Sequence, residues 1–448
     1  MGESTKPARG MRDFLPDDVR RRKYVIDVIE DVYQRYGYQP LETPAVENIE
    51  TLLGKYGEEG NKLIYKILKR GEHEHTGEAD LALRYDLTVP LARVIAEHRG
   101  TLPRFFKRYQ IQPVWRADRP ARGRFREFYQ CDVDAIGSTS PVVEVEQLAA
   151  VSDVLARLGF DDFSIRLNHR EVLRGLLDVS GIEAALHESA LVAIDKLDKI
   201  GIDGVVADLT SRGIDDASAR KVVAAFSTTD GEENDTVVAR LGDTLTDHVT
   251  ASEGLQVLSS VLQLSSATTA GSRLKLDPGL ARGLSYYTGA IFEVAVKDLS
   301  GSLGGGGRYD NLIGMFSGEK VPACGFSLGL ERILVVMAER GMFPAHLAAG
   351  GIDVMATIWN ADSITETLAL AGDLRAAGLG VEVYPEPDKL GKQMKYASNR
   401  GAQFVTIEGD DERARGEVTI KNLATGEQQA VRRADAATWF GERVARRS

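Results

Sequence analysis

The chain has 448 residues, of which 43% are hydrophobic and 27% charged, and its formal net charge is −11. Because this length exceeds one ordinary hydrophobic core, we expect two or three domains. The acidic balance argues against a protein that coats nucleic acid over its whole surface, but it is compatible with a local basic site. Cys131 and Cys324, the only cysteines, supply neither a disulfide framework nor a set of zinc ligands.

Location in the cell follows from the same composition. No apolar run of the sequence is long enough to span a bilayer. Residues 1–18 lack the apolar stretch of a secretory signal peptide. We therefore expect a protein of the reducing cytoplasm.

The first third of the chain alternates helices and strands. Apolar residues at helical spacing predict an amphipathic helix over residues 17–36, and an extended segment with two prolines follows over 36–47. Residues 81–98 predict a strand and then a helix that begins near Pro90. Residues 104–137 predict two strands joined by a basic loop.

The second of these strands, residues 123–134, carries an unusual polar face. Side chains alternate along a strand, so one face carries Phe125, Glu127, Tyr129, Cys131 and Val133. The other face carries Arg124, Arg126, Phe128, Gln130, Asp132 and Asp134. A charged face of this kind usually faces water. However, nine basic residues and one acid lie between Arg99 and Arg126, which indicates that an anion meets this segment.

The rest of the chain changes character twice. Residues 172–262 are helical and acidic, as expected of an inserted domain. Strand character resumes over residues 274–296, and a glycine-rich turn (301–318) and a strand that runs into a helix (323–340) follow. From Gly351 onward, apolar strands alternate with helices, which predicts a small α/β domain with a mainly parallel sheet.

Several arginines stand at strand ends or helix starts beside glycine or aromatic residues: Arg116, Arg124, Arg126, Arg282 and Arg332. Arginine suits phosphate because its planar fork binds two oxygens at once and keeps its charge. Neither GxxxxGK[ST] nor GxGxxG occurs in the sequence. Together these arginines predict a polyphosphate site that is built without a glycine-rich phosphate loop.

Two other motifs give weaker evidence for a catalytic or metal site. GFSLG, residues 325–329, matches the GxSxG nucleophile elbow. The only histidine after Ser327 is His346, in the same helical region, so a catalytic triad has little room and a hydrolase is disfavoured. His73 and His75 flank Glu74 in a polar loop without partners at metal spacing, so we expect no metal held by protein side chains.

Six stretches of the chain resemble those of one family, the histidyl-tRNA synthetases, which are class II aminoacyl-tRNA synthetases. They are its opening (residues 10–18), class II motif 1 (41–47), motif 2 (114–134), motif 3 (325–333), and the two histidine-specific signatures (280–289 and 304–312). Motifs 1 to 3 alone indicate only class II. The last two stretches, LARGLSYYTG and GGGGRYDNL, indicate the amino acid.

The resemblance implies a fold and a reaction. The fold is an α+β catalytic domain on a six- to seven-stranded antiparallel sheet (residues 1–170 and 264–345). It carries a helical insertion that clasps the acceptor arm (171–263) and an α/β anticodon-binding domain (351–448). The implied enzyme activates L-histidine with ATP to histidyl-adenylate and pyrophosphate, with Mg²⁺ on the outer phosphates. It then transfers histidine to the 3′ end of tRNA(His), and it acts as a homodimer.

The resemblance also implies roles for residues of the site. Arg282 and Arg116 are the implied catalytic cations, at the substrate carboxylate and the α-phosphate. The implied ATP-binding residues are Arg116, Asp118, Arg124, Phe125 and Arg332, with Phe125 and Arg332 on either side of adenine. The implied histidine-binding residues are Asp86, Thr88, Gln130, Asp134, Arg282, Tyr286, Tyr287 and Tyr309. Because Phe125 falls on the apolar face by strict alternation, its role requires a bend near the loop.

The sequence departs from the family pattern in two ways, and two alternatives stay open. Asp86, Asp118 and Asp134 stand where many members carry Glu, and Ser285 stands where GLDYYTG has Asp. One alternative is the non-catalytic regulatory paralogue of ATP phosphoribosyltransferase, which lacks the anticodon domain and several active-site arginines. The other alternative is a class II synthetase for another amino acid.

Overall fold

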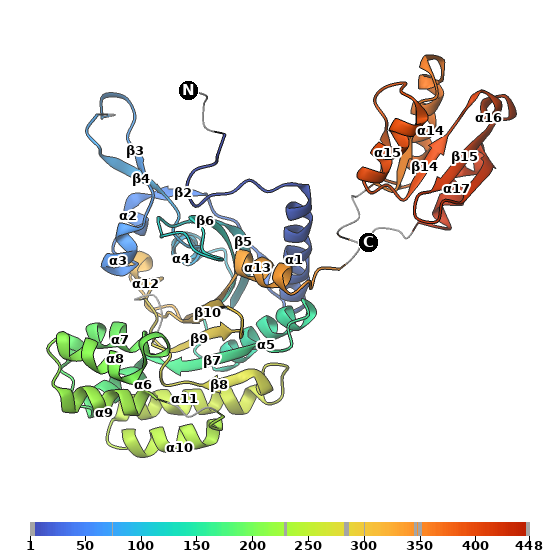
Figure 1. The fold of residues 1–448 in the computed structure, drawn as a ribbon. Coiled ribbons are helices and arrows are strands. Elements are labelled where there is room, and N and C mark those ends of the chain that lie inside the picture. The colour runs from blue at the N-terminus through green and yellow to red at the C-terminus, as the bar shows by residue number, and fades with distance from the viewer. Residues whose placement is uncertain are drawn as a thin grey trace. The chain divides into compact units, whose positions relative to one another are not determined.

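The computed structural model describes residues 5–73, 75–227, 231–281, 286–299, 301–344, 347 and 352–444. Arg282 and Ser285 therefore lie outside the described residues. The chain forms two compact units, one of residues 1–14 and 22–342 and the other of residues 15–21 and 343–448. Each unit contains its own central sheet (Figure 1).

The first unit is built on an eight-stranded sheet in the order β1-β5-β6-β11-β10-β9-β7-β8. Its strands are β1 (Gln39–Pro40), β5 (Phe106–Trp115), β6 (Glu127–Ile136), β7 (Ser164–His169), β8 (Leu274–Leu276), β9 (Ala290–Ala295), β10 (Ser302–Arg308) and β11 (Ala323–Gly329). The six strands from β5 to β7 pair antiparallel. The short strands β1 and β8 add parallel edges. The predicted antiparallel catalytic sheet is confirmed, with two edge strands added.

The polar strand starts later than the alternation predicts. β6 begins at Glu127, not at Gly123. Gly123 has φ 67°, and Ala121 and Arg124 exchange backbone hydrogen bonds of 3.0 and 2.9 Å, so the chain turns tightly before the strand. Residues 124–126 therefore belong to the loop between β5 and β6. The alternation of side chains along the strand does not apply to Phe125.

Some of the helices of the first unit cover the apolar face of this sheet, opposite the polar side chains of β6, and others, α4 among them, pack against the end of its polar face. The helices of the catalytic part are α1 (Pro16–Arg35), α2 (Ile49–Leu52), α3 (Gly57–Lys62), α4 (Thr88–Glu97), α5 (Val142–Arg157), α12 (Gly314–Ser317) and α13 (Leu330–Glu339). Both α5 and α13 contact β6, where Cys131 and Val133 are fully buried. A small sheet of β2 (Val46–Asn48), β4 (Ala79–Leu83) and β3 (Lys66–Leu68) stands beside them.

The inserted segment is helical, as the sequence predicts. Its helices are α6 (Arg170–Val179), α7 (His187–Ile194), α8 (Leu197–Ser211), α9 (Asp216–Phe226), α10 (Asn234–Leu245) and α11 (Val249–Ser265). They form the green and yellow layer along the edge of the sheet that carries β7 and β8 (Figure 1). The domain boundaries given above stay predictions. In the described part of the chain, no helix combines the length and the apolar character needed to cross a membrane.

The second unit has a five-stranded sheet in the order β13-β12-β14-β15-β16. Its elements are β12 (Val354–Ala356), α14 (Ile364–Ala376), β13 (Val381–Val383), α15 (Leu390–Asn399), β14 (Phe404–Ile407), α16 (Asp410–Arg415), β15 (Glu417–Asn422), β16 (Gln428–Arg432) and α17 (Ala436–Gly441). The first three strands of that order are parallel, and β15 and β16 are antiparallel. The expected mainly parallel sheet is thus mixed, because the short β15–β16 turn can join only antiparallel strands.

Candidate active site

Buried polar side chains form a floor on β5 and β6. Directly opposite residues are Arg108 and Asp134, Gln110 and Asp132, and Gln112 and Gln130. On the other side of β6, the small residues Gly325, Ser327 and Gly329 of β11 face the same three β6 residues. Asp132 and Asp134 are each 2% exposed, and Arg108 is fully buried. The polar face of β6 is therefore an interior face and not a solvated one.

Ion pairs and hydrogen bonds tie this floor together. The Arg108 guanidinium lies 2.8 Å from the Asp134 carboxylate and 3.8 Å from that of Asp132. The Tyr309 hydroxyl donates a hydrogen bond to Asp134 Oδ1, and Gln130 Nε2 donates to Ser327 Oγ at 2.9 Å. Burial raises the pKa of both aspartates against the opposing effect of Arg108. One cation thus serves two buried carboxyl groups.

The floor also presents unused hydrogen-bonding capacity. Six of its buried polar atoms have no hydrogen-bond partner among the described residues: Arg108 Nε and Nη1, Gln110 Oε1, Gln130 Oε1, Asp132 Oδ1, and Asp134 Oδ2, which forms the ion pair with Arg108. Buried polar groups are paired in the great majority of cases, and leaving one unpaired costs about 1–3 kcal/mol. A cluster of such atoms on one sheet face indicates a binding site for a polar ligand.

A third buried carboxylate, that of Asp86, lies just before α4. Asp86 accepts hydrogen bonds from the Tyr56 hydroxyl at 2.9 Å, from Val89 N at 3.0 Å and from the Tyr286 hydroxyl at 3.3 Å. Burial raises its pKa. Thr88, the first residue of α4, is also buried.

Tyrosine rings connect the Asp86 and Asp134 carboxylates. The Tyr286 ring lies 5.0 Å from that of Tyr287 and 5.9 Å from that of Tyr309, measured between centroids. Tyr286 reaches Asp86 and Tyr309 reaches Asp134. The structure therefore brings together Asp86, Tyr286, Tyr287, Tyr309 and Asp134, which the sequence predicts as one pocket.

Arg116, at the end of β5, is held so that its charged fork stays available. Its Nε donates to Tyr85 O at 3.0 Å. The guanidinium lies over the rings of Tyr85 and Phe128, at 4.4 and 5.1 Å from their centroids. Within the described residues, neither Nη group of Arg116 forms a hydrogen bond. The Nη donors of a positioned cation are thus left available for an anionic ligand.

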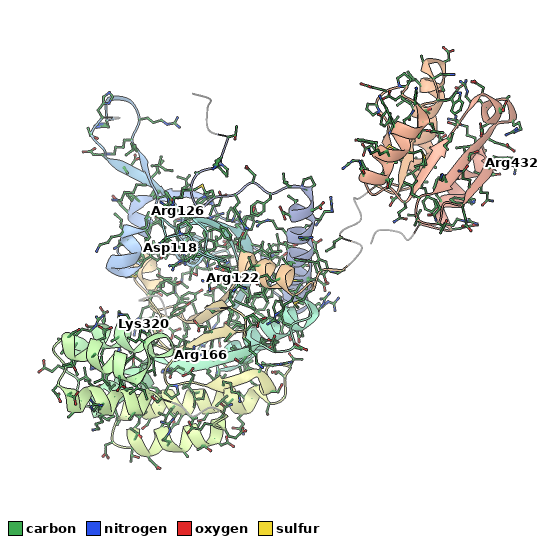
Figure 2. The ribbon with its side chains drawn as sticks, in the orientation of Figure 1. Asp118, Arg122, Arg126, Arg166, Lys320 and Arg432 are labelled. Atoms are coloured by element: carbon green, nitrogen blue, oxygen red, sulfur yellow. The ribbon has the colours of Figure 1, made fainter. Side chains whose placement is uncertain are left out.

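The loop before β6 holds three of the other residues predicted to bind ATP, and the fourth, Arg332, belongs to α13. Asp118 accepts from Arg124 Nη2 at 2.7 Å, and its carbonyl accepts from Arg126 Nε at 3.0 Å, so Asp118 and Arg126 lie close together in Figure 2. The Phe125 ring is covered by the Arg12 guanidinium, 3.6 Å from the ring centroid. Arg332 donates to Ser302 O. The placement of adenine between Phe125 and Arg332 stays a prediction.

Sequence reasoning missed several residues of this site. Arg108, Gln110 and Gln112 repeat every second residue in KRYQIQPVW, residues 107–115, and the alternation applied to β6 would have found them. Tyr56 and Arg12 carry no such local pattern, because their role depends on contacts with Asp86 and Phe125, far away in the sequence.

A cavity of about 700 Å³ lies beside the tyrosines, with Tyr286, Tyr287 and Thr288 in its wall. Its cationic side chains are Lys55, Arg170, Arg174 and Lys320, and its carboxylates are Glu171 and Asp310. Lys320 is labelled in Figure 2. Cations outnumber carboxylates here, so the potential at this opening favours anions.

Comparison with known proteins agrees with the geometry of the site. The family described as histidyl-tRNA synthetase matches residues 10–333, and the anticodon binding domain matches residues 353–443. A histidine–tRNA ligase of Porphyromonas gingivalis is 43% identical, and the alignment covers 96% of this chain and 97% of that protein. Another, of Gloeobacter violaceus, is 41% identical, covering 97% and 98%. The chain belongs to the histidyl-tRNA synthetase family.

Solved structures agree with this assignment. The crystal structure of histidyl-tRNA synthetase from Nostoc sp. PCC 7120 matches with a TM-score of 0.82 and 32% identity, covering 99% of this chain and all of that one. A Bacillus halodurans structure described as an ATP phosphoribosyltransferase regulatory subunit/histidyl-tRNA synthetase has a TM-score of 0.71 at 21% identity, which shows a shared fold. Because the relatives that align over nearly the full length of the chain are histidine–tRNA ligases, the chain is a histidine–tRNA ligase. Enzymes of this family use ATP.

The buried Asp132 predicts a pH-dependent stability of the synthetase. Burial raises its pKa to about 7, against about 3.9 in an unfolded chain. Between these values the folded state binds more protons than the unfolded state, so stability falls as pH rises. The Asp132→Asn variant therefore gains stability relative to the parent on going from about pH 5 to about pH 8, as measured by thermal unfolding.

A matched control is Asp162→Asn. Hydrogen bonding to Arg340 lowers the pKa of Asp162, so this group is ionised throughout that pH range and its variant keeps a constant difference from the parent. An Asp132→Asn difference that is equal at both pH values would contradict the prediction.

Proposed function

We propose that the polar floor of the first unit binds L-histidine and ATP together and joins them into histidyl-adenylate and pyrophosphate. Histidine then passes to the 3′ end of tRNA(His). The observation that carries this proposal is the cluster of buried, unpaired polar atoms on β5 and β6, next to the Asp86–tyrosine–Asp134 pocket. A polar ligand that pairs these atoms recovers the free energy that burying them costs.

Histidine fits the pocket by its hydrogen-bonding groups. Its imidazole requires an acceptor for one N–H and a polar partner for the other nitrogen, roles that we assign to Asp134 and Tyr287. Gln130, four residues before Asp134 on the same face of β6, carries an unpaired Oε1 and is assigned to the same ligand. Tyr286 and Tyr309 form the walls.

Asp86 and Thr88 bind the α-amino group of histidine. A buried carboxylate of raised pKa gains most from a cationic partner, because the partner restores the stability of its charged form.

The arginines in and around the loop before β6 bind ATP. The substrate carboxylate attacks the α-phosphorus, a new P–O bond forms, and the bond to pyrophosphate breaks. Arg116 balances the charge that develops on the α-phosphate, since its Nη groups are already oriented by Tyr85 and Phe128. Arg282, which lies outside the described residues, is assigned to the carboxylate and the same phosphate. Arg124 binds the terminal phosphates, and the adenine stacks between Phe125 and Arg332.

Mg²⁺ accompanies the outer phosphates in this proposal. This ion usually keeps several waters and binds one or two carboxylates together with substrate phosphates. Asp118, in the loop with Arg124, is a carboxylate of the kind required. In this proposal the ion arrives with the nucleotide, because the substrate phosphates supply part of its ligands. When bound, it neutralises phosphate charge.

The remaining assignments concern the partners. Residues 351–448 bind the anticodon part of tRNA(His), and the helical insertion (171–263) clasps the acceptor arm. The protein works as a cytoplasmic homodimer through its motif 1 segment. The match of residues 353–443 to the anticodon binding domain supports the first assignment.

Gly325 gives a direct test of the pocket. A Cβ at this position would overlap the Asp134 carboxylate, so we expect Gly325→Ala to displace Asp134 and to raise KM for histidine by at least tenfold, equivalent to about 1.4 kcal/mol. Gly372→Ala is the control, since a Cβ there meets nothing within 4 Å and alanine favours the helix. Unchanged histidine KM in Gly325→Ala would remove Asp134 from the pocket.

The overall test is amino-acid-dependent ATP–pyrophosphate exchange by the purified protein with each of the twenty amino acids. We expect exchange with histidine alone, because a site built on hydrogen bonds rejects analogues that lack them by roughly 10⁴ to 10⁵. Exchange with another amino acid would overturn the Asp134 and Tyr287 assignment. No exchange with any of them would overturn the proposed chemistry.

A further inference from the structure

The strand order of the second unit defines the edge of its sheet at which a ligand is expected to bind. β12 lies between β13 and β14, and all three strands are parallel. The helices α14 and α15, which connect these strands, pack on opposite faces of the sheet, and in open α/β sheets ligands bind outside the carboxyl ends of the strands at such a switch point. The segment that follows β12 at this point is Thr357–Ser363.

An exposed aromatic residue stands at that edge. Trp359 is 44% exposed, although all residues from Ile352 to Ile358 are buried. One side of its indole lies against the backbone of Gly409, where a Cβ would be 3.6 Å from the ring atoms Cδ2 and Cε2. The ring is therefore supported by the chain that leaves β14, and much of its surface stays accessible.

Hydrogen bonds fix the ring in this position. Trp359 Nε1 donates to Asp410 Oδ2 at 3.3 Å, and its backbone N–H donates to Ser363 Oγ at 3.1 Å. The preceding residue, Ile358, donates its N–H to the buried amide of Gln393 at 2.9 Å. An exposed tryptophan that is tied at both its indole and its backbone has lost most of its rotational freedom before any ligand binds.

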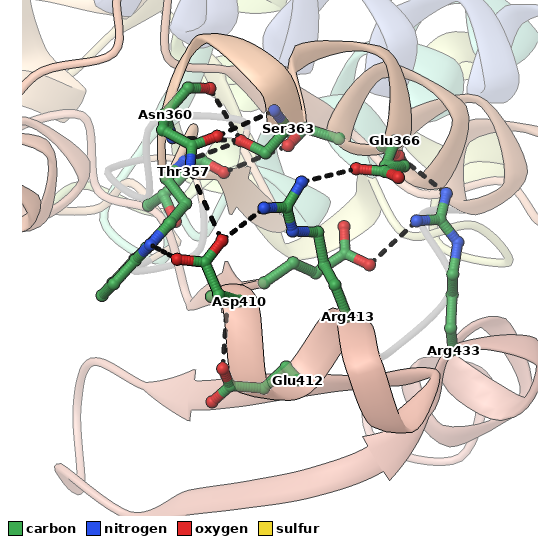
Figure 3. Close-up of polar contacts among 12 residues, drawn as sticks. Thr357, Asn360, Ser363, Glu366, Asp410, Glu412, Arg413 and Arg433 are labelled. Carbon is green, nitrogen blue, oxygen red and sulfur yellow. Dashed lines mark hydrogen bonds and ion pairs between the residues drawn. The ribbon is translucent and has the colours of Figure 1, made fainter.

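A wider network holds Asp410 in turn (Figure 3). Arg413 pairs with Asp410 and, at 3.0 Å, with Glu366 of α14. Asn360 Nδ2 donates to Asp410 Oδ1 at 3.5 Å. Figure 3 shows these contacts converging on Asp410, which is thereby a positioning residue for the indole.

A cation lies near the same edge. Lys389 is the residue before α15. The Gln393 side chain donates to the carbonyl of the adjacent Asp388 and to that of Ile358, which precedes Trp359. Lys389 is exposed and forms no ion pair within the described residues. An aromatic platform with a nearby cation is the combination that binds an unpaired base and its phosphate.

We propose that Trp359 is a stacking platform for one unpaired base of the bound tRNA. This inference rests on the proposed function, in which residues 351–448 bind the anticodon part of tRNA(His). Bases in single-stranded loops are splayed out and stacked on aromatic side chains, and a ring that is already immobilised pays little entropy on binding.

The test compares Trp359→Ala with Trp359→Phe in the full-length protein. The probe is a tRNA(His) transcript, and the dissociation constant is measured by filter retention at fixed salt. We expect Trp359→Ala to weaken binding about 5- to 150-fold, the loss of one base stack. Trp359→Phe keeps a ring and retains most of the affinity. The control is Leu368→Ala, at a residue of similar exposure (51%) on α14, which leaves binding unchanged.

Histidine-dependent exchange needs no tRNA and is measured on the same preparations. Failure of exchange in the parent protein would overturn the proposed function, while the comparison of dissociation constants still decides the role of Trp359. Equal affinity of Trp359→Ala and the parent would overturn the stacking proposal. Equal losses in Trp359→Ala and Trp359→Phe would also overturn it, because the indole N–H, and not the ring face, would then carry the effect.

Discussion

Replacing Arg116 with alanine is expected to lower the rate of histidine-dependent ATP–pyrophosphate exchange by about 10²- to 10³-fold. The reason is geometric. Tyr85 O, the Tyr85 ring and the Phe128 ring hold the guanidinium in place, so its two Nη groups require no reorganisation when charge develops on the α-phosphate. Preoriented donors in a buried site are worth more than mobile ones in water.

Arg116→Lys separates charge from geometry. Lysine keeps one positive charge but not the planar fork, so this variant recovers only part of the rate. Arg119→Ala is the control in the same loop, since Arg119 is exposed and keeps the exchange rate near that of the parent. An exchange rate in Arg116→Ala within tenfold of the parent would remove Arg116 from the phosphate site.

Replacing Arg108 with methionine is expected to destabilise the first unit by about 3–5 kcal/mol, the usual cost of breaking a buried ion pair from one side. Arg108 is fully buried and is the ion-pair partner of both Asp134 and Asp132. Methionine fills much of the volume but leaves two carboxyl groups without a cation. Urea denaturation at about pH 8, where ionised carboxylates are favoured, measures the loss.

Two companion variants show whether the buried charge is the cause. Arg108→Met with Asp132→Asn removes one of the two stranded carboxylates, so it recovers part of the lost free energy of unfolding. Arg340→Ala breaks the partly exposed surface pairs with Asp162 and Asp298 and costs about 0–1 kcal/mol for each pair. Equal losses in Arg108→Met and Arg340→Ala would show that the floor is solvated.

Local pattern was sufficient for the longer elements of this protein, but not for short helices such as α2, α3 and α12. Helical spacing over residues 17–36 corresponds to α1 (Pro16–Arg35), and the helical insertion and the alternating C-terminal strands and helices are also present. These features depend on side-chain period and on turn residues, which a sequence displays directly. The start of β6 was wrong by four residues, because the turn through Gly123, closed by backbone hydrogen bonds between Ala121 and Arg124, precedes the strand.

The sequence by itself also determined the family, because its motifs combine residues whose types are restricted by chemistry. Only the tertiary structure decided which polar groups meet. Arg108 and Asp134 lie 26 positions apart in the sequence, and the register of β5 against β6 makes them partners. In the same way, contact between distant segments covers Phe125 with Arg12 and supports Trp359 on Gly409. Register and long-range packing are set by the burial of whole faces, so no local stretch of sequence specifies them.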